Sequence, residues 1–153
     1  MFNYFIEFKK QHPSNLRLLI TGKDDMPVPP HPEIDFRGFV DDEEKLQLMA
    51  GAKMFLMPSG NESFSIVTLE AMAQRAPVLA SGVSEVLVDH VNTSGAGRTY
   101  GDYETFAAAL NELLGDDRKR AEMGDLGRDY VLSRFTRDRV RNALLDAVKS
   151  CES

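Results

Sequence analysis

Two glutamates, Glu62 and Glu70, stand on either side of a hydroxyl-rich stretch where a loop runs into an apolar helical pattern. One carboxylate near a helix start is common, because it caps free N–H groups and interacts favourably with the helix dipole. Glu70 lies deeper in the pattern, beside Leu69, where no cap is needed. Alone, Glu62 is typical of a cap or a solvated loop residue, and Glu70 of an exposed helix acid. Together they favour a ligand whose hydroxyl groups are held at two separated points.

The start of the same helix offers a second kind of contact. The backbone N–H groups of Phe64, Ser65 and Ile66 lie at the first turn, so they have no partners within the helix and can face an anion. The hydroxyl groups of Ser63 and Ser65 are as typical of local capping as of ligand contact. A phosphate flanked by two hydroxylated groups describes a nucleotide sugar, and the stretch predicts this ligand class.

Short apolar runs alternate with helical patterns along most of the chain, and from Asp102 onward the pattern is helical only. We expect strands over residues 16–22, 34–40, 54–59, 76–81 and 97–100. We expect helices over residues 2–12, 41–53, 65–75 and 85–89, with His90 as a turn residue that caps a helix end or faces the sugar pocket. The alternation predicts an α/β fold with a Rossmann-like, doubly wound parallel sheet, helices on both faces and a helical C-terminus.

Ligands of such sheets bind beyond the carboxyl ends of the strands, in the loops that lead into helices. Three loops meet this condition, at residues 22–25, 38–42 and 59–64. The third loop carries the most hydroxyl and amide groups. It is also the loop that contains Glu62 and leads into the helix of Glu70.

The composition limits the classes of function. A chain of 153 residues is long enough for one domain with a sizeable core, and its 42% hydrophobic and 27% charged residues are ordinary for a globular protein. The net charge of -6 argues against a general nucleic-acid binder or a coat on anionic membranes. No apolar run approaches the ~20 residues of a membrane span, and the opening residues lack a signal-peptide pattern. The single cysteine, Cys151, fits a reducing compartment, so we expect a cytoplasmic protein.

Three stretches together resemble one enzyme family. The stretch "ESFSIVTLEAMAQRAPVLAS" (62–81) resembles the glutamate–seven–glutamate signature of the retaining, family-4 (group 1) glycosyltransferases of the GT-B fold. The stretch "IDFRGFVDDEEKLQLMAGAKMFLMPS" (34–59) resembles the segment just upstream of it, and "LLGDDRKRAEMGDLGRDYVLSRFT" (113–136) is similar to the family's C-terminal helices. The resemblance covers nearly the whole chain. It implies that residues 1–153 form the nucleotide-sugar-binding half of a two-domain enzyme, without its N-terminal acceptor domain.

The resemblance also implies roles for individual residues. Glu62 would belong to the catalytic site and contact hydroxyls of the donor sugar, and Glu70 would bind the ribose. The remaining substrate contacts would come from Phe64, Ser65 and Ile66 at the distal phosphate, from Gly38 and Phe39 at the base, and from Gly22 nearby. No metal and no cofactor would be required, because the nucleotide-diphosphate sugar is itself the donor substrate.

Two departures from the family pattern stand out. The paired-glycine loop after the strand at 76–81 is reduced to Gly82. The family's first strand, with an arginine and a lysine that neutralise the diphosphate, has no counterpart before the helix at 2–12. Since that strand lies in the middle of the family's sheet, we expect exposed sheet edges, and marginal stability or self-association of the chain.

The sequence therefore predicts the donor-binding half of a glycosyltransferase that transfers a sugar, with retention, to a glycan, a lipid or another acceptor. We expect the chain to be inactive alone and to need a nucleotide sugar and the acceptor domain as partners, but no nucleic acid. Peripheral membrane association of the full-length enzyme stays open. The alternative is a non-catalytic module, or a remnant, that binds a nucleotide or a nucleotide sugar.

Overall fold

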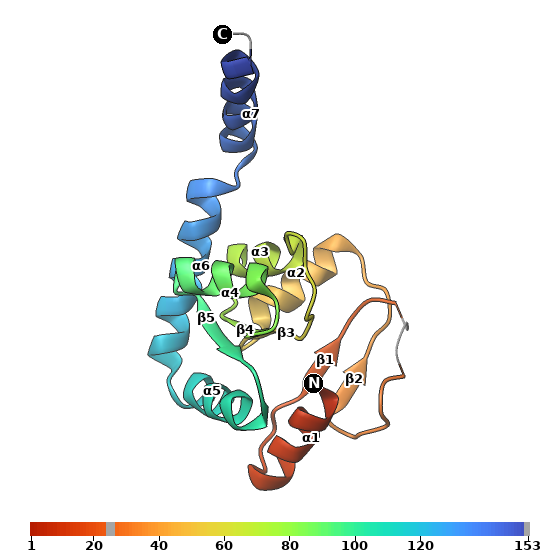
Figure 1. Cartoon of the computed structure of the whole chain (residues 1–153). Helices are drawn as coiled ribbons and strands as arrows, with labels where there is room; N and C mark the ends of the chain where they lie inside the picture. The colour runs from red at the N-terminus through yellow and green to blue at the C-terminus, as the bar shows by residue number, and fades with distance from the viewer. Residues whose placement is uncertain (24–26, 152–153) are drawn as a thin grey trace.

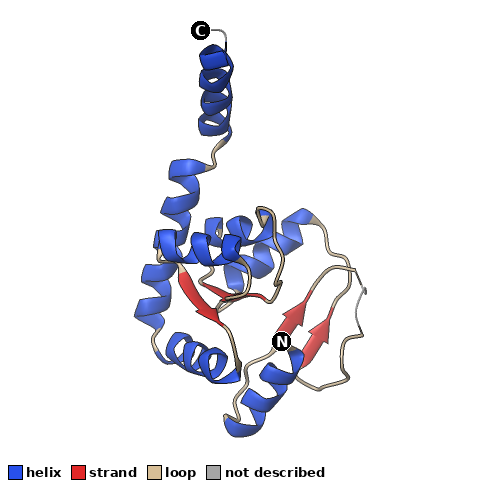
Figure 2. Ribbon diagram, viewed as in Figure 1, coloured by secondary structure: helices blue, strands red, loops and turns tan. Residues whose placement is uncertain are grey.

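Helices pack on both sides of a three-stranded parallel sheet, and a separate pair of parallel strands lies at one side of the molecule (Figure 1 and Figure 2). The computed structural model describes residues 1–23 and 27–151. In chain order, the elements are α1 (Phe2–Gln11), β1 (Leu18–Ile20), β2 (Ile34–Phe36), α2 (Asp42–Gly51), β3 (Phe55–Met57), α3 (Ile66–Ala73), β4 (Val78–Ser81), α4 (Glu85–Ser94), β5 (Gly97–Tyr100), α5 (Tyr103–Gly115), α6 (Asp117–Arg134) and α7 (Arg137–Cys151). The ligand loop expected at residues 22–25 lies partly outside the described residues.

The strands are hydrogen-bonded in two groups. Strand β1 pairs with β2, and β4 lies between β3 and β5, with every pair parallel. Among the described residues, no strand pairing joins β1 to β3. The α/β class, the parallel strands and the helical C-terminus are confirmed, and each strand lies inside the range expected from the sequence. The parallel strands form two separate hydrogen-bonded sheets (Figure 2).

Strand β4 carries the core, because its four residues are all buried and its side chains alternate between two faces. Leu79 packs with residues of α1 and α5, among them Phe8 and Phe106. Val78 and Ala80 pack with α3, α4 and α6 on the other face. Fully burying a side chain such as Leu79 stabilises the fold by about 1.5–3 kcal/mol. The helices on both faces agree with the expected doubly wound arrangement.

Helix α1 is connected to both groups of strands. Its Phe5 and Phe8 are buried, and Phe8 belongs to the cluster that covers β4 and β5. Its Lys9 is also buried, and the ammonium group lies 2.8 Å from the carboxylate of Glu33, next to β2. The same ammonium donates to the carbonyl of Leu16, just before β1, at 3.1 Å. Because a buried charge needs partners, these contacts fix α1 against the β1–β2 side.

Helix α4 is longer than the range 85–89 expected from the sequence. Ser84 caps its start, and it continues to Ser94, where Gly95 with a φ of 70° ends it in the left-handed conformation. The polar residues before Gly95 belong to the helix, and the hydroxyl of Ser94 donates to the carbonyl of His90 at 2.6 Å. The expectation that His90 is a turn residue capping a helix end is therefore wrong, since His90 lies inside α4 and is buried.

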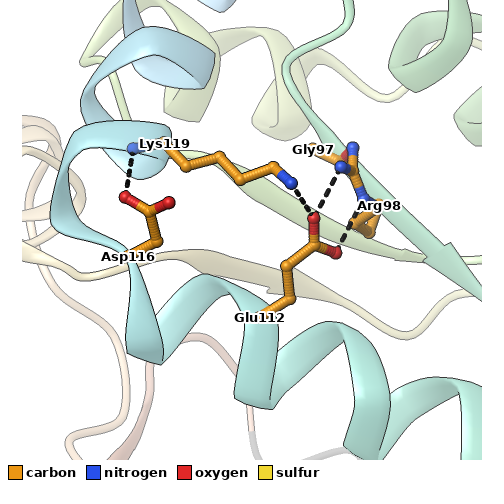
Figure 3. Close-up of polar contacts among 5 residues, drawn as sticks. All are labelled: Gly97, Arg98, Glu112, Asp116 and Lys119. Carbon is orange, nitrogen blue, oxygen red and sulfur yellow. Dashed lines mark hydrogen bonds and ion pairs between the residues drawn. The ribbon is translucent and has the colours of Figure 1, made fainter.

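Helix α6 crosses α3 closely and is linked to α5 and β5 by an ion-pair network (Figure 3). Arg98 of β5 donates to both carboxylate oxygens of Glu112 in α5, at 2.7 and 3.0 Å. Lys119 of α6 forms an ion pair with the same carboxylate. These hydrogen bonds from Arg98 and Lys119 lower the pKa of Glu112 from 4.5 to about 2.

Helix α7 projects away from the rest of the molecule (Figure 1). Its apolar side chains Val140, Leu144, Leu145 and Val148 are exposed. None of the helices in the described part of the chain is both long and apolar enough to cross a membrane.

Candidate functional site

The loop between β3 and α3 holds most of the residues that the sequence singles out. Ser65, the residue before α3, is buried and has a φ of 59°, a left-handed conformation that costs a residue with a side chain about 1–2 kcal/mol. Its hydroxyl is 2.8 Å from that of Thr68, so it is engaged within the protein and does not cap the helix backbone. Within the described part of the chain, no acceptor receives the N–H groups of Phe64, Ser65 and Ile66. These three donors are available to a ligand.

The two glutamates have different surroundings. The Glu62 side chain is half-buried in the loop, and no hydrogen-bond or ion-pair partner for it lies among the described residues. Glu70 faces Lys45 of α2, whose ammonium lies 3.0 Å from one carboxylate oxygen and 3.1 Å from the other. The hydrogen bond to Glu70 is the main cause of the raised pKa of Lys45. Glu70 is thus a carboxylate held in place by a cation, and not a freely solvated helix acid.

The loops after β1 and β2 meet. The N–H of Gly22 donates to the carbonyl of Gly38 at 2.8 Å, and both glycines have positive φ, at 122° and 68°. A side chain at either position would be strained, so both turns favour glycine. Phe39, the next residue, is 86% exposed. The structure therefore brings together the three residues expected near the base, and it leaves an aromatic ring open for stacking.

Helix α2 connects this corner to the helix of Glu70. Asp41 caps the start of α2 by accepting from the N–H of Glu44 at 2.8 Å. One turn later, Lys45 lies between Asp42 and Glu70, at 3.0 Å from a carboxylate oxygen of each. Lys45 is a partner of the candidate residue Glu70 that the sequence did not indicate. Its partner Glu70 lies 25 positions away, so only the packing of α2 on α3 brings the two together.

His90 packs against the loop that contains Phe64. One ring nitrogen, Nε2, is 2.9 Å from the carbonyl oxygen of Phe64, and the other, Nδ1, is 2.9 Å from the hydroxyl of Tyr130 in α6. Beside this histidine, the loop, α4 and α6 line an open cavity of about 410 Å³. The sequence did not predict that His90 contacts the Phe64 carbonyl, or that Tyr130 contacts His90.

The comparison with known proteins decides the family. The family model described as "Glycosyl transferases group 1" matches residues 3–116. The chain belongs to the group 1 glycosyltransferases. Glu62, Glu70, Gly22, Gly38 and residues 64–66 all lie inside the matched region.

Several curated glycosyltransferases are similar to this chain. The lipopolysaccharide core biosynthesis glycosyltransferase LpsE of Rhizobium meliloti is 28% identical over 120 residues, which are 76% of this chain and 34% of LpsE. The D-inositol 3-phosphate glycosyltransferase of Corynebacterium urealyticum is 31% identical over 111 residues, which are 71% of this chain and 26% of that enzyme. The chain thus spans about a third or less of the length of these two relatives.

Solved structures share the fold of this chain. HepE of Anabaena, in a crystal structure with UDP-glucose, matches with a TM-score of 0.80 and 20% identity, over 97% of this chain and 44% of HepE. Sucrose-phosphate synthase of Thermosynechococcus elongatus matches with a TM-score of 0.79 and 23% identity, over 99% of this chain and 43% of that enzyme. At these identities the likeness concerns the fold alone.

Proposed function

We propose that this chain is the donor-binding part of a retaining glycosyltransferase, and that its ligand is a nucleotide-diphosphate sugar. The observation that carries the proposal is the set of three free N–H groups at residues 64–66, which follow the unpaired carboxylate of Glu62 in the chain and precede the Lys45-paired carboxylate of Glu70. A phosphate fits the N–H groups, and a hydroxylated group fits each carboxylate. The HepE structures, which contain UDP or UDP-glucose, support this ligand class.

Each part of the site has a separate task in this proposal. The ribose hydroxyls donate to the carboxylate of Glu70, which the ion pair with Lys45 orients. Gly22 and Gly38 let the backbone approach the base, and the exposed ring of Phe39 stacks beside it. Glu62 accepts hydrogen bonds from hydroxyls of the donor sugar.

Departure of the nucleotide is the step that these groups assist. When the bond between the sugar and the distal phosphate breaks, negative charge develops on the leaving phosphate oxygen. The N–H groups of residues 64–66 and the positive end of the α3 dipole stabilise that charge. This arrangement requires no metal ion and no separate cofactor. The acceptor, a glycan, a lipid or another molecule, would come with an N-terminal domain.

Calorimetric titration with UDP and UDP-glucose tests these assignments. Glu70→Gln should weaken the binding of both ligands by about 1–3 kcal/mol, the range for a charge-assisted hydrogen bond. Glu62→Gln should weaken the binding of UDP-glucose and leave the binding of UDP nearly unchanged, because UDP lacks the glucose whose hydroxyls Glu62 accepts from. Glu104→Gln, an exposed acid of α5, is the matched control and should change neither affinity.

Two outcomes would contradict the assignments. Equal losses for UDP and UDP-glucose in the Glu62 variant would remove Glu62 from the donor-sugar position. Tight binding of UDP-glucose without any sugar transfer, even after an acceptor domain is supplied, would favour the alternative of a non-catalytic binding module.

A further inference from the structure

The hydrogen bonds of His90 fix which ring nitrogen carries the proton. A carbonyl oxygen can only accept, so the contact of 2.9 Å between Nε2 and the Phe64 carbonyl requires that Nε2 is the donor. In the neutral ring, Nδ1 is then an acceptor, and it receives the hydroxyl hydrogen of Tyr130 at 2.9 Å. His90 is 5% exposed, so both contacts are shielded from water. Tyr130 thereby selects the tautomer that His90 needs in order to hold Phe64.

The carbonyl of Phe64 belongs to the same peptide unit as the N–H of Ser65. Because a trans peptide is planar, its C=O and N–H point in opposite directions. Holding the carbonyl on His90 therefore points the N–H of Ser65 away from α4. Ser65 has a φ of 59°, a strained conformation that persists only where its surroundings fix it. The bond from His90 is one such restraint, applied to the peptide just before the strained residue.

The side chain of Phe64 is restrained by the same surroundings. Its ring meets the ring of His90 edge-on, with centroids 5.9 Å apart, and that of Phe135 at 5.6 Å. Phe135 in turn meets Tyr130 at 5.4 Å. Backbone and side chain of Phe64 are thus both tied to α4 and to the end of α6, which are elements outside the loop that carries the proposed ligand contacts.

We propose that His90 is a positioning residue for the phosphate contact, and that Tyr130 holds it in the required tautomer. His90 does not touch the ligand. It orients the Phe64–Ser65 peptide so that the N–H of Ser65 points toward the distal phosphate. The inference rests on the proposed function for the identity of the phosphate ligand, whereas the orientation of the peptide can be measured without any ligand.

The test compares three variants of the whole chain. His90→Leu replaces the imidazole with an apolar side chain of similar size and so removes the Nε2–H donor. His90→Gln keeps an N–H donor near the position of Nε2 and should restore the bond to Phe64. Tyr130→Phe removes the hydroxyl that donates to Nδ1, so that the Phe64 carbonyl alone holds the proton on Nε2.

The first readout is nuclear magnetic resonance of the unliganded protein. We expect the nitrogen shifts of the His90 ring to show a proton on Nε2, and the amide signal of Ser65 to move in His90→Leu and return toward its original position in His90→Gln. In Tyr130→Phe, the Nε2–H form should still dominate, because the Phe64 carbonyl accepts from it, but its share should be smaller than in the unmodified protein. A proton on Nδ1 in the unmodified protein would overturn the inference, even if His90→Leu does not fold.

The second readout is binding of UDP and of uridine, which lacks the phosphates. We expect His90→Leu to lower the affinity for UDP roughly tenfold, as for the loss of one hydrogen bond to a charged group. The affinity for uridine should not change. His90→Gln should recover most of the UDP affinity. Equal losses for UDP and uridine would mean a general structural role and would overturn the inference. If the unmodified chain binds no UDP while the Ser65 and tautomer signals behave as expected, the proposed function fails and the positioning of the peptide stands.

Discussion

The ion-pair network around Glu112 should make stability depend on pH in a way that one substitution removes. Arg98 and Lys119 lower the pKa of Glu112 from 4.5 to about 2. A tenfold change in proton affinity is worth about 1.4 kcal/mol, so the shift corresponds to at most about 3–4 kcal/mol of folding free energy. The Glu112 and Arg98 side chains are 32% and 37% exposed, and solvent screening reduces the expected contribution to about 1–2 kcal/mol.

The sign follows from the lowered pKa. The folded state holds the Glu112 proton less tightly than the unfolded state, so the contribution is fully present above pH 4.5 and is lost as the pH falls from 4.5 to about 2. Glu112→Gln should therefore lower the melting temperature at pH 7 by roughly 2–8 °C. The difference between the two proteins should shrink as the pH falls through that window.

Thermal melts of both proteins between pH 7 and pH 2 provide the assay. The matched control is Glu122→Gln, because Glu122 pairs with Arg118 in an exposed contact one turn apart on α6. Such a pair is worth about 0.3–0.5 kcal/mol, so this variant should melt almost like the unmodified protein. Equal melting temperatures of Glu112→Gln and the unmodified protein at pH 7 would refute the reasoning. So would a difference that stays constant down to pH 2.

Three further predictions concern packing, the ligand and assembly. In Gly124→Ala, the new Cβ would lie 2.4 Å from the Arg75 carbonyl oxygen, so thermal melts should show a loss of about 1–3 kcal/mol, while Gly115→Ala, which meets open space, should show none. A chelator should leave the UDP affinity in calorimetry unchanged, and a collapse of affinity would disprove metal-free binding. Light scattering on the isolated chain should show self-association, because β1 and β3 each carry an unpaired edge in the described structure; a monodisperse monomer with a cooperative melt at ~45–65 °C would contradict this.

The sequence predicted the elements well where a local pattern decides them. Phe106, Leu110 and Leu113 recur on one face of α5, and all three are buried. The end of α4 was missed, because the polar residues after Asp89 resemble a loop. In the structure, the hydroxyl of Ser94 folds back onto the carbonyl of His90, and the burial of His90 keeps this stretch helical. Tertiary contacts therefore outweighed local composition at this helix.

In the candidate site, too, the sequence indicates residues of a local motif and misses those that tertiary packing brings in. Glu62 and Glu70 were predicted as site residues because they lie in one continuous motif, and residues 64–66 because a helix start leaves N–H groups free; these roles stay predictions. Lys45 and Tyr130 were missed, since their partners Glu70 and His90 lie 25 and 40 positions away. Contacts of that range depend on how helices pack, and a pattern read along one chain does not contain that information.

The division of the strands into two groups has a consequence for local unfolding. Strand β4 is wholly buried, whereas the residues of β1 and β2 are only partly buried or exposed, so the amide hydrogens of β1 and β2 should exchange with solvent earlier than those of β4. A nucleotide sugar that contacts both Gly38, after β2, and Glu70, in α3, would bind only when both sheets are folded. Its binding would then slow amide exchange in β1 and β2 more than in β4. The ligand would thus couple the local unfolding of the β1–β2 pair to that of the rest of the fold.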